Sequence, residues 1–253
     1  MSAALRFELP LPDLAPWRAG NTGVAGVWHF DSGQPGRAVL ITALIHGNEL
    51  CGAWALKGLL EAGVRPARGT LTLALCNLAA FDRFDADRHD AARFVEQDLN
   101  RQWTPERLRA ADSVERRRAA ELAPFAERAD WLLDLHSMHE PSAPLLLTGV
   151  QPRNLALARQ LAAPEHIVID AGHSDGVRLR DFGRFGLPDA QAGDSRSLLL
   201  ECGFHGDPAS RAVAQDMCRR FLQAAGTLDA AALDAALPGW RLLDAPRQWA
   251  LTV

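Results

Sequence analysis

The 253-residue sequence contains no tyrosine and only one lysine, Lys57, so arginine supplies nearly all of its positive charge. It has no apolar run of the roughly 18 residues that a membrane-spanning helix needs. The first residues lack the charged-then-apolar pattern of a signal peptide. The formal net charge of −4 provides no positive field for nucleic acid or an anionic membrane. These absences predict a cytoplasmic protein that binds neither.

Cysteine is also sparse, and its four copies are scattered at Cys51, Cys76, Cys202 and Cys218. No two of them form a CxxC pair, so the sequence indicates neither a thiolate zinc cluster nor a redox motif. We expect reduced, mostly buried thiols that pack like small apolar side chains.

Buried apolar runs alternate with segments of helical periodicity along the chain. Strands are expected at residues 37–45, 70–78, 129–135 and 197–201, with shorter ones in APLLLTG and EHIVIDAG. Helices are expected at residues 49–63, 105–129 (kinked or broken near Pro124) and 152–161, and a helix or helix pair at 208–237. Residues 81–103, rich in Asp and Arg, are expected to form a long ordered loop. The alternation predicts an α/β protein, a three-layer α/β/α fold around a mixed, mostly parallel sheet.

Three polar side chains stand directly after, or at the end of, predicted strands. His46 follows AVLITALI, His136 follows WLLDL, and Glu201 closes SLLLE. Because sites in open α/β sheets form at the carboxyl ends of strands, we expect these residues to converge in space.

His46 and Glu49 form an HxxE pair at a strand-to-helix junction, where a three-residue step lets both side chains face one point. Alone, such a pair is more often a surface or capping feature. With His136 as a third ligand it makes the His₂Glu set of catalytic zinc sites with an open fourth position. The sequence therefore predicts one zinc ion per chain, held by His46, Glu49 and His136.

The loop RFVEQDLNRQW supplies candidates for substrate contacts. Asn100 and Arg101 offer an amide and a guanidinium fork suited to a carboxylate, and Arg93 suits the charge that develops on a carbonyl oxygen. Asp98 suits the second ring nitrogen of a zinc-binding histidine. The alternatives are a solvated charged loop for the arginines and a turn or cap residue for Asp98.

Glu201 ends an otherwise apolar strand, which is a costly place for an unpaired carboxylate. Beside a metal it suits a general base that later donates the proton. A structural ion pair is the competing interpretation. His139, His173 and His205 lie near these segments, but nothing in their spacing favours a direct role for them.

The four motifs HGNE, DLNR, DLHS and LLLE, in this order, resemble those of the succinylglutamate desuccinylase/aspartoacylase family. The resemblance covers roughly residues 20 to 230, and the family is related to the zinc carboxypeptidases, which implies a zinc-exopeptidase-like fold. It implies zinc ligation by His46, Glu49 and His136, with Glu201 as the general acid/base.

The resemblance also implies that Asn100 and Arg101 hold the carboxylate of the amino-acid part of the substrate. Arg93 would polarise the scissile carbonyl, and Asp98 would support His46. The implied reaction is hydrolysis of an N-acyl amino acid, a small molecule, to a carboxylate and a free amino acid.

The chain departs from the family pattern in two places. Aspartoacylase-like members carry a tyrosine in a C-terminal β-rich domain, whereas this chain has none. A further substrate-binding arginine is expected about ten residues before the catalytic glutamate, where Gln191 stands; Arg184 and Arg196 are the nearby alternatives. We interpret residues 1–238 as the catalytic domain and residues 239–253 as a tail that begins the C-terminal β domain.

Two other functions are open at the level of sequence. The same residues would serve a carboxypeptidase-like metallopeptidase with a wider cleft, or a zinc-binding protein with little catalysis. Glu201 and Arg93 favour an enzyme, because binding alone needs no base beside the metal. The sequence leaves the oligomeric state open, with a homodimer among the options.

Overall fold

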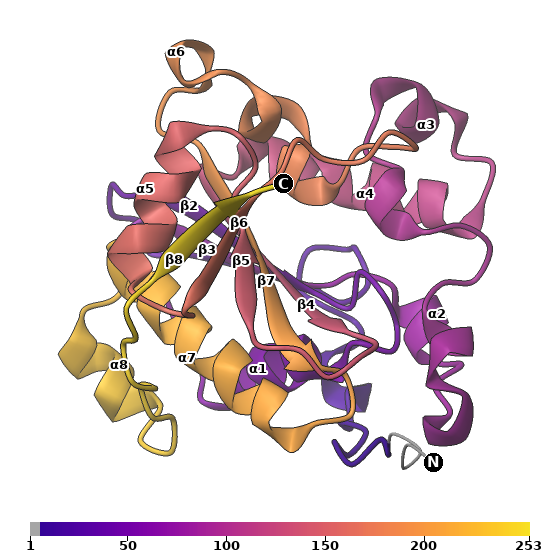
Figure 1. Cartoon of the computed structure of the whole chain (residues 1–253), viewed down its shortest axis with the longest axis horizontal. Coiled ribbons are helices and arrows are strands. Elements are labelled where there is room, and N and C mark those ends of the chain that lie inside the picture. The colour runs from indigo at the N-terminus through magenta and orange to yellow at the C-terminus, as the bar shows by residue number, and fades with distance from the viewer. Residues whose placement is uncertain (1–5) are drawn as a thin grey trace.

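The computed structural model describes residues 6–253 and is built on one eight-stranded sheet, ordered β1-β3-β2-β4-β7-β5-β6-β8 (Figure 1). The strands are β1 (Val27–Asp31), β2 (Ala38–Ala43), β3 (Thr70–Leu75), β4 (Trp131–Met138), β5 (Leu145–Leu147), β6 (His166–Ile169), β7 (Arg196–Phe204) and β8 (Trp249–Thr252). Among the strands of residues 6–253, only the β1–β3 and β5–β7 pairs are antiparallel. The sheet is therefore mixed and mostly parallel.

Helices cover both faces of this sheet. They are α1 (Leu50–Glu61), α2 (Leu78–Phe81), α3 (Pro105–Ala110), α4 (Val114–Arg128), α5 (Pro152–Leu161), α6 (Asp189–Ala192), α7 (Pro208–Ala224) and α8 (Ala230–Ala236), with 3-10 helices at Ala15–Trp17, Ala86–Ala92, Leu99–Arg101, Leu179–Asp181 and Gly183–Gly186. Helices α1, α5 and α7 pack into one apolar cluster, and α4 with the 179–185 segment into another. The predicted three-layer α/β/α fold is confirmed.

Side-chain alternation divides the central strands between the two clusters. In β4, Leu133 and Leu135 face α1 and α7, whereas Leu132 faces α4. By the same period of two, His136 lies on the α4 face. In β7, Leu200 and Cys202 pack with α7, which places Glu201 on the α4 face as well. Both polar residues therefore open onto the same side of the sheet.

The strands that carry the site are longer than the sequence indicated. Glu201 does not close its strand, because β7 continues to Phe204, and β4 continues past His136 to Met138. An irregularity in the pairing between His136 and Met138 allows both strands to run on. His136 and Glu201 remain paired in register one residue before this irregularity.

The helix predicted at residues 105–129 is two helices, and its break is not at Pro124. Helix α3 ends at Ala110, because Ala111 has a left-handed φ of 44° that cannot continue a helix. Ser113 then caps α4 by accepting a hydrogen bond from the backbone N–H of Arg116. Pro124 lies inside α4, near its end. The sequence also gave no indication of β1, which pairs antiparallel along one edge of the sheet.

Strand β2 ends abruptly before the HGNE motif. Leu44 has a φ of 58°, a left-handed conformation that a leucine rarely adopts. Its carbonyl accepts the backbone N–H of Asn77, and the carbonyl of Ala43 accepts that of Cys76. These bonds hold the turn that brings His46 into the interior.

The tail reaches the sheet at its β8 edge, where β8 pairs in parallel with β6. Residues 239–248 lead to it without helix or strand. The division at residue 238 into a catalytic domain and a tail remains a prediction. Among residues 6–253, no helix is both long and apolar enough to cross a membrane.

We expect the centre of the sheet to control stability. Leu133 in β4 is fully buried, so Leu133→Ala should lower the free energy of unfolding by about 2–5 kcal/mol. Leu251→Ala in β8 makes the same change at a side chain that is 62% exposed, and should stay within about 0.5 kcal/mol. Urea denaturation followed by circular dichroism measures both, and equal losses would contradict this assignment of the core.

Candidate metal centre

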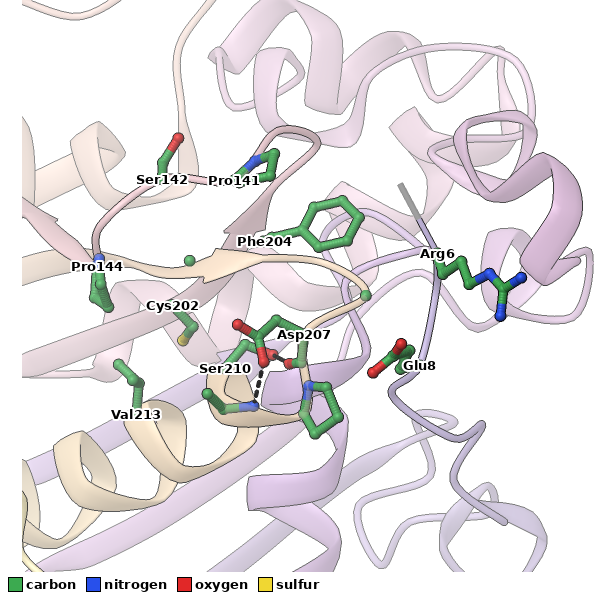
Figure 2. Close-up of a pocket in the computed structure, with 14 residues that line it drawn as sticks. Arg6, Glu8, Pro141, Ser142, Pro144, Cys202, Phe204, Asp207, Ser210 and Val213 are labelled. Atoms are coloured by element: carbon green, nitrogen blue, oxygen red, sulfur yellow. Dashed lines mark hydrogen bonds between the residues drawn. The ribbon is translucent and has the colours of Figure 1, made fainter. Parts of the chain in front are cut away.

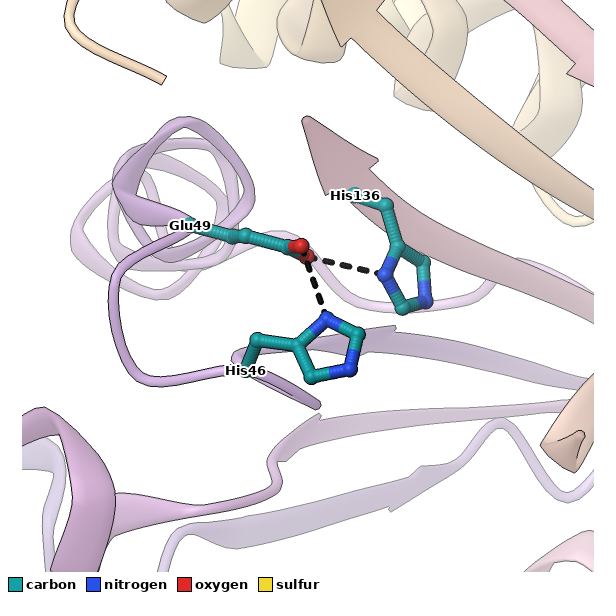
Figure 3. A group of neighbouring side chains, drawn as sticks. All are labelled: His46, Glu49 and His136. Carbon is teal, nitrogen blue, oxygen red and sulfur yellow. Dashed lines mark hydrogen bonds and ion pairs between the residues drawn. The ribbon is translucent and has the colours of Figure 1, made fainter. Parts of the chain in front are cut away.

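Three buried side chains converge at the carboxyl ends of β2 and β4 (Figure 3). His46 Nδ1 lies 2.7 Å from Glu49 Oε1, and His136 Nδ1 lies 2.8 Å from Glu49 Oε2. One donor atom from each residue lies within 4.8 Å of the other two. The structure thus brings together the three residues that the sequence singled out as metal ligands.

Each imidazole has a carboxylate at its other nitrogen. His46 Nε2 lies 3.0 Å from Asp98 Oδ1, in the contact expected from the sequence. His136 Nε2 lies 2.9 Å from Asp134 Oδ2. Asp134 is fully buried, and its other oxygen accepts a 2.7 Å hydrogen bond from Thr42 Oγ1. Sequence reasoning missed Asp134, although the DLH spacing, with side chains two apart on one face of a strand, could have indicated it.

The carboxylates decide the charge of the cluster. Burial alone would lower the pKa of His46, but Glu49 and Asp98 outweigh this effect and raise it. Burial would likewise lower the pKa of His136, yet Asp134 and Glu49 hold it well above its usual value. Glu49 is buried, which would raise its pKa, but the two imidazoles keep it well below the ordinary range. The site therefore favours a cation between its donor atoms.

The donor set fits a zinc ion. Two imidazole nitrogens and one carboxylate are ligands that zinc prefers, and three protein ligands leave a position for substrate or water. The two Glu49 oxygens each face one imidazole Nδ1, so the three donor groups point at a common centre. The two outer carboxylates would fix the ring orientation of the histidines.

Glu201 stands beside this cluster because β7 pairs with β4. Glu201 and His136 are direct partners in the parallel register, so their side chains project to the same face. Burial raises the pKa of the Glu201 carboxyl to about 7. Its Oε2 is buried and has no hydrogen-bond partner in the described chain, so the competing interpretation of a structural ion pair finds no partner there. A carboxyl of this pKa can take up and release a proton near neutral pH.

A cavity of about 280 Å³ opens from the cluster. Arg93, Asn100, Arg101 and Glu201 line it together with the three clustered residues. Arg93 lies 3.1 Å from Asp98 and 3.9 Å from Glu49, and its side chain is 37% exposed. The 81–103 loop is ordered, as predicted, and folds into short 3-10 helices that bring these side chains to one wall.

Asn100 has a fixed orientation in this cavity. Its side-chain carbonyl accepts a 3.0 Å hydrogen bond from the backbone N–H of Leu179, so the amide N–H₂ group is the part left for a ligand. The Arg101 guanidinium donates to the backbone carbonyl of Asn100 at 3.0 Å and lies 3.2 Å from Asp175. Asp175 is 70% exposed, so this ion pair is weak and replaceable.

Glu115 holds the loop in place and was also missed from the sequence. Its carboxylate is fully buried in α4 and accepts the consecutive backbone N–H groups of Val95, Glu96 and Gln97 at 2.7–3.1 Å. It also accepts a hydrogen bond from Asn77 Nδ2. No spacing rule connects a helical glutamate with a loop some twenty residues earlier, so the sequence carried no signal for it.

Gly47, inside HGNE, permits the loop to approach. A Cβ atom there would lie 2.4 Å from the backbone of Ala80 and Phe81 and 2.5 Å from the Ala92 carbonyl oxygen. The Gly47 N–H donates to the Arg93 carbonyl at 3.1 Å. The absence of a side chain at Gly47 thus lets the turn that carries His46 and Glu49 contact the loop that carries Arg93.

The remaining sequence candidates divide between the cavity and its surroundings. His139 and His173 line the cavity, whereas His205 is buried beside it, hydrogen-bonded to Ser137. Arg184 donates to the Ala129 carbonyl and Arg196 pairs with Asp194. Neither arginine lines the cavity, and neither does Gln191.

A larger cavity, about 460 Å³, lies beside Cys202 and the start of α7 (Figure 2). It is therefore on the α7 face of the sheet, opposite to the metal cluster. Asp207 and Ser210, which border it, are engaged in capping α7. None of the three clustered residues lines it.

A model of the succinylglutamate desuccinylase/aspartoacylase catalytic domain matches residues 35–177, more than half of the chain. The chain belongs to this family. The matched segment contains the three clustered residues and the loop from Arg93 to Arg101, while Glu201 lies beyond it. A comparison with curated proteins gave no match.

Solved structures of the family share the fold at low identity. A succinylglutamate desuccinylase/aspartoacylase-type protein from Shewanella frigidimarina NCIMB 400 has a TM-score of 0.67 at 18% identity, covering 100% of this chain and 77% of its own. The ectoine utilization protein EutE (DoeB) from Ruegeria pomeroyi has a TM-score of 0.61 at 19% identity, and the match covers 87% of this chain and 63% of that protein. A succinylglutamate desuccinylase/aspartoacylase from Rhodobacter sphaeroides has a TM-score of 0.58 at 21% identity, and the match covers 78% of this chain and 58% of that protein. This chain thus spans less than two thirds of the latter two.

The hydrogen bonds of Glu115 predict a loss of both stability and activity on substitution. Glu115→Gln replaces an acceptor by a donor that faces other donors, and should lower the free energy of unfolding by about 1–3 kcal/mol. Because the loop carries Arg93 and Asp98, the hydrolytic kcat/KM should also fall. Glu127→Gln, an exposed position in the same helix, is the matched control. Unchanged denaturation and kinetics in Glu115→Gln would contradict the positioning role.

Proposed function

We propose that this chain is a zinc-dependent amidohydrolase that cleaves the amide bond of N-acyl amino acids. The observation that carries the proposal is the buried group of His46, Glu49 and His136 with Glu201 in register beside it. His46 Nδ1, Glu49 and His136 Nδ1 would hold one zinc ion. When bound, zinc would polarise the amide carbonyl and lower the pKa of a water molecule at its open position.

Each of the other residues of the site has a separate role in the proposed hydrolysis. Glu201 accepts a proton from the attacking water and passes it to the nitrogen of the leaving amine, which its raised pKa suits. Arg93 stabilises the negative charge that develops on the carbonyl oxygen. The Asn100 amide and the Arg101 guanidinium hold the carboxylate of the amino-acid part. Asp98 and Asp134 keep the two imidazoles oriented.

Removal of the metal should abolish activity and lower stability. Protein loaded with zinc should contain one zinc per chain by elemental analysis, and a chelator should remove both the zinc and the release of amine from N-acyl amino acids. Because the ion would neutralise a buried anionic cluster, the apoprotein should also melt at a lower temperature. A panel of N-acetyl and N-succinyl amino acids and short peptides, assayed for free amine, measures activity. Cleavage of peptides alone would favour the carboxypeptidase-like alternative.

Glu201→Gln should separate catalysis from metal binding. The amide keeps the size of the side chain but cannot carry the proton, so kcat should fall by about 10²–10⁴-fold while one zinc per chain is retained. Glu140→Gln makes the same chemical change at an exposed side chain and should leave kcat unchanged. Full activity in Glu201→Gln would overturn its assignment as the proton carrier.

A further inference from the structure

The wall of the cavity beside Asn100 carries a third guanidinium, that of Arg178, whose neighbour Leu179 donates its backbone N–H to the Asn100 side chain. Arg178 lines the cavity together with Asp170 and His173, and its side chain is only 3% exposed. It precedes the 3-10 helix Leu179–Asp181, in a segment that folds back over the sheet after β6. With Arg93 and Arg101, it makes up the set of arginines in this cavity.

Arg178 is already bound to two carboxylates of the protein. Its Nη1 and Nη2 donate to the two oxygens of Asp170 at 2.8 and 2.9 Å, and its Nε donates to Asp181 at 2.8 Å. A guanidinium grips a carboxylate along an edge that presents two N–H groups in parallel. Asp170 occupies the Nη1–Nη2 edge of Arg178, and Asp181 occupies the Nε end of its Nε–Nη edge.

The charge of this wall is balanced internally. Asp181 also accepts a hydrogen bond from Arg180, so two arginines face two aspartates. The nearby His173 adds no positive charge, because burial and the neighbouring Arg101 and Arg178 lower its pKa. By contrast, among residues 6–253 the one carboxylate in ion-pair contact with Arg101 is the exposed Asp175. The cavity therefore offers one readily available site for a substrate carboxylate, at Asn100 and Arg101.

From this arrangement we infer that the preferred substrates are N-acyl amino acids with a single carboxylate, that of the amino acid itself. The inference rests on the proposed function and names its substrate class. A second carboxylate, on the acyl group or on the side chain of the amino acid, would enter the cavity without a free cation opposite it. It would also approach Asp170, whose charge is shared with Arg178 but whose side chain remains 15% exposed.

The test compares substrates that differ in charge but not in size. N-acetyl-L-asparagine is set against N-acetyl-L-aspartate, N-acetyl-L-glutamine against N-acetyl-L-glutamate, and N-succinamoyl-L-alanine against N-succinyl-L-alanine. With the zinc-loaded wild-type protein, kcat/KM should be higher for the uncharged member of each pair by on the order of tenfold or more, chiefly through KM. Equal or faster hydrolysis of the dicarboxylates would overturn the inference while leaving the amidohydrolase function in place. No amine from any substrate would overturn both.

A variant tests the role of the bound arginine directly. Asp170→Asn keeps the size of the side chain but withdraws one charged acceptor from the Arg178 fork. The ratio of kcat/KM for the dicarboxylate to that for its uncharged partner should rise by about tenfold. Asp82→Asn, at an exposed ion pair outside the cavity, should leave the ratio unchanged. If Asp170→Asn fails to fold, the wild-type comparison decides alone; an unchanged ratio in a folded variant would contradict the role of Asp170.

Discussion

A carboxylate that is buried between two imidazoles is the constraint on which the site depends. Glu49 is 1% exposed, and charge at such depth is tolerated only when neighbouring groups compensate it. His46 and His136 do so on one side, and Asp98 and Asp134 then balance the histidines from behind. The result is a chain of alternating charges from the loop into the sheet, ending at Thr42. These contacts fix the orientations of the His46 and His136 rings in the absence of a ligand.

The fold class and the three clustered residues could be predicted from the sequence because both depend on local patterns. Buried runs of four to nine apolar residues mark central strands, and polar residues at their ends mark the edge of the sheet where sites form. The exact strand ends could not be predicted. The pairing of β4 with β7 extends both strands past His136 and Glu201, and that extension is set by a neighbour distant in sequence.

Residues whose partners are not marked by any spacing pattern escaped prediction. Glu115 binds backbone N–H groups, which every residue except proline carries, so no residue type marks its partners in the sequence. Arg178 resembles any other arginine until the loop after β6 places Asp170 and Asp181 around it. Near Gln191, neither Arg184 nor Arg196 lines the cavity, whereas Arg178, earlier in the chain, does so and is already bound by the protein. Tertiary contacts decide which of these charges is available.

The hydrogen bond from the Leu179 N–H to the Asn100 side chain has a consequence for the ageing and divergence of such a protein. Conversion of Asn100 to aspartate, by spontaneous deamidation or by a single substitution, would preserve the oxygen that Leu179 requires. It would replace the amide donor by a negative charge on the cavity side. A chain altered in this way would keep its fold and its loop contacts yet repel the carboxylate that it is proposed to bind. Folding assays would not detect such damage.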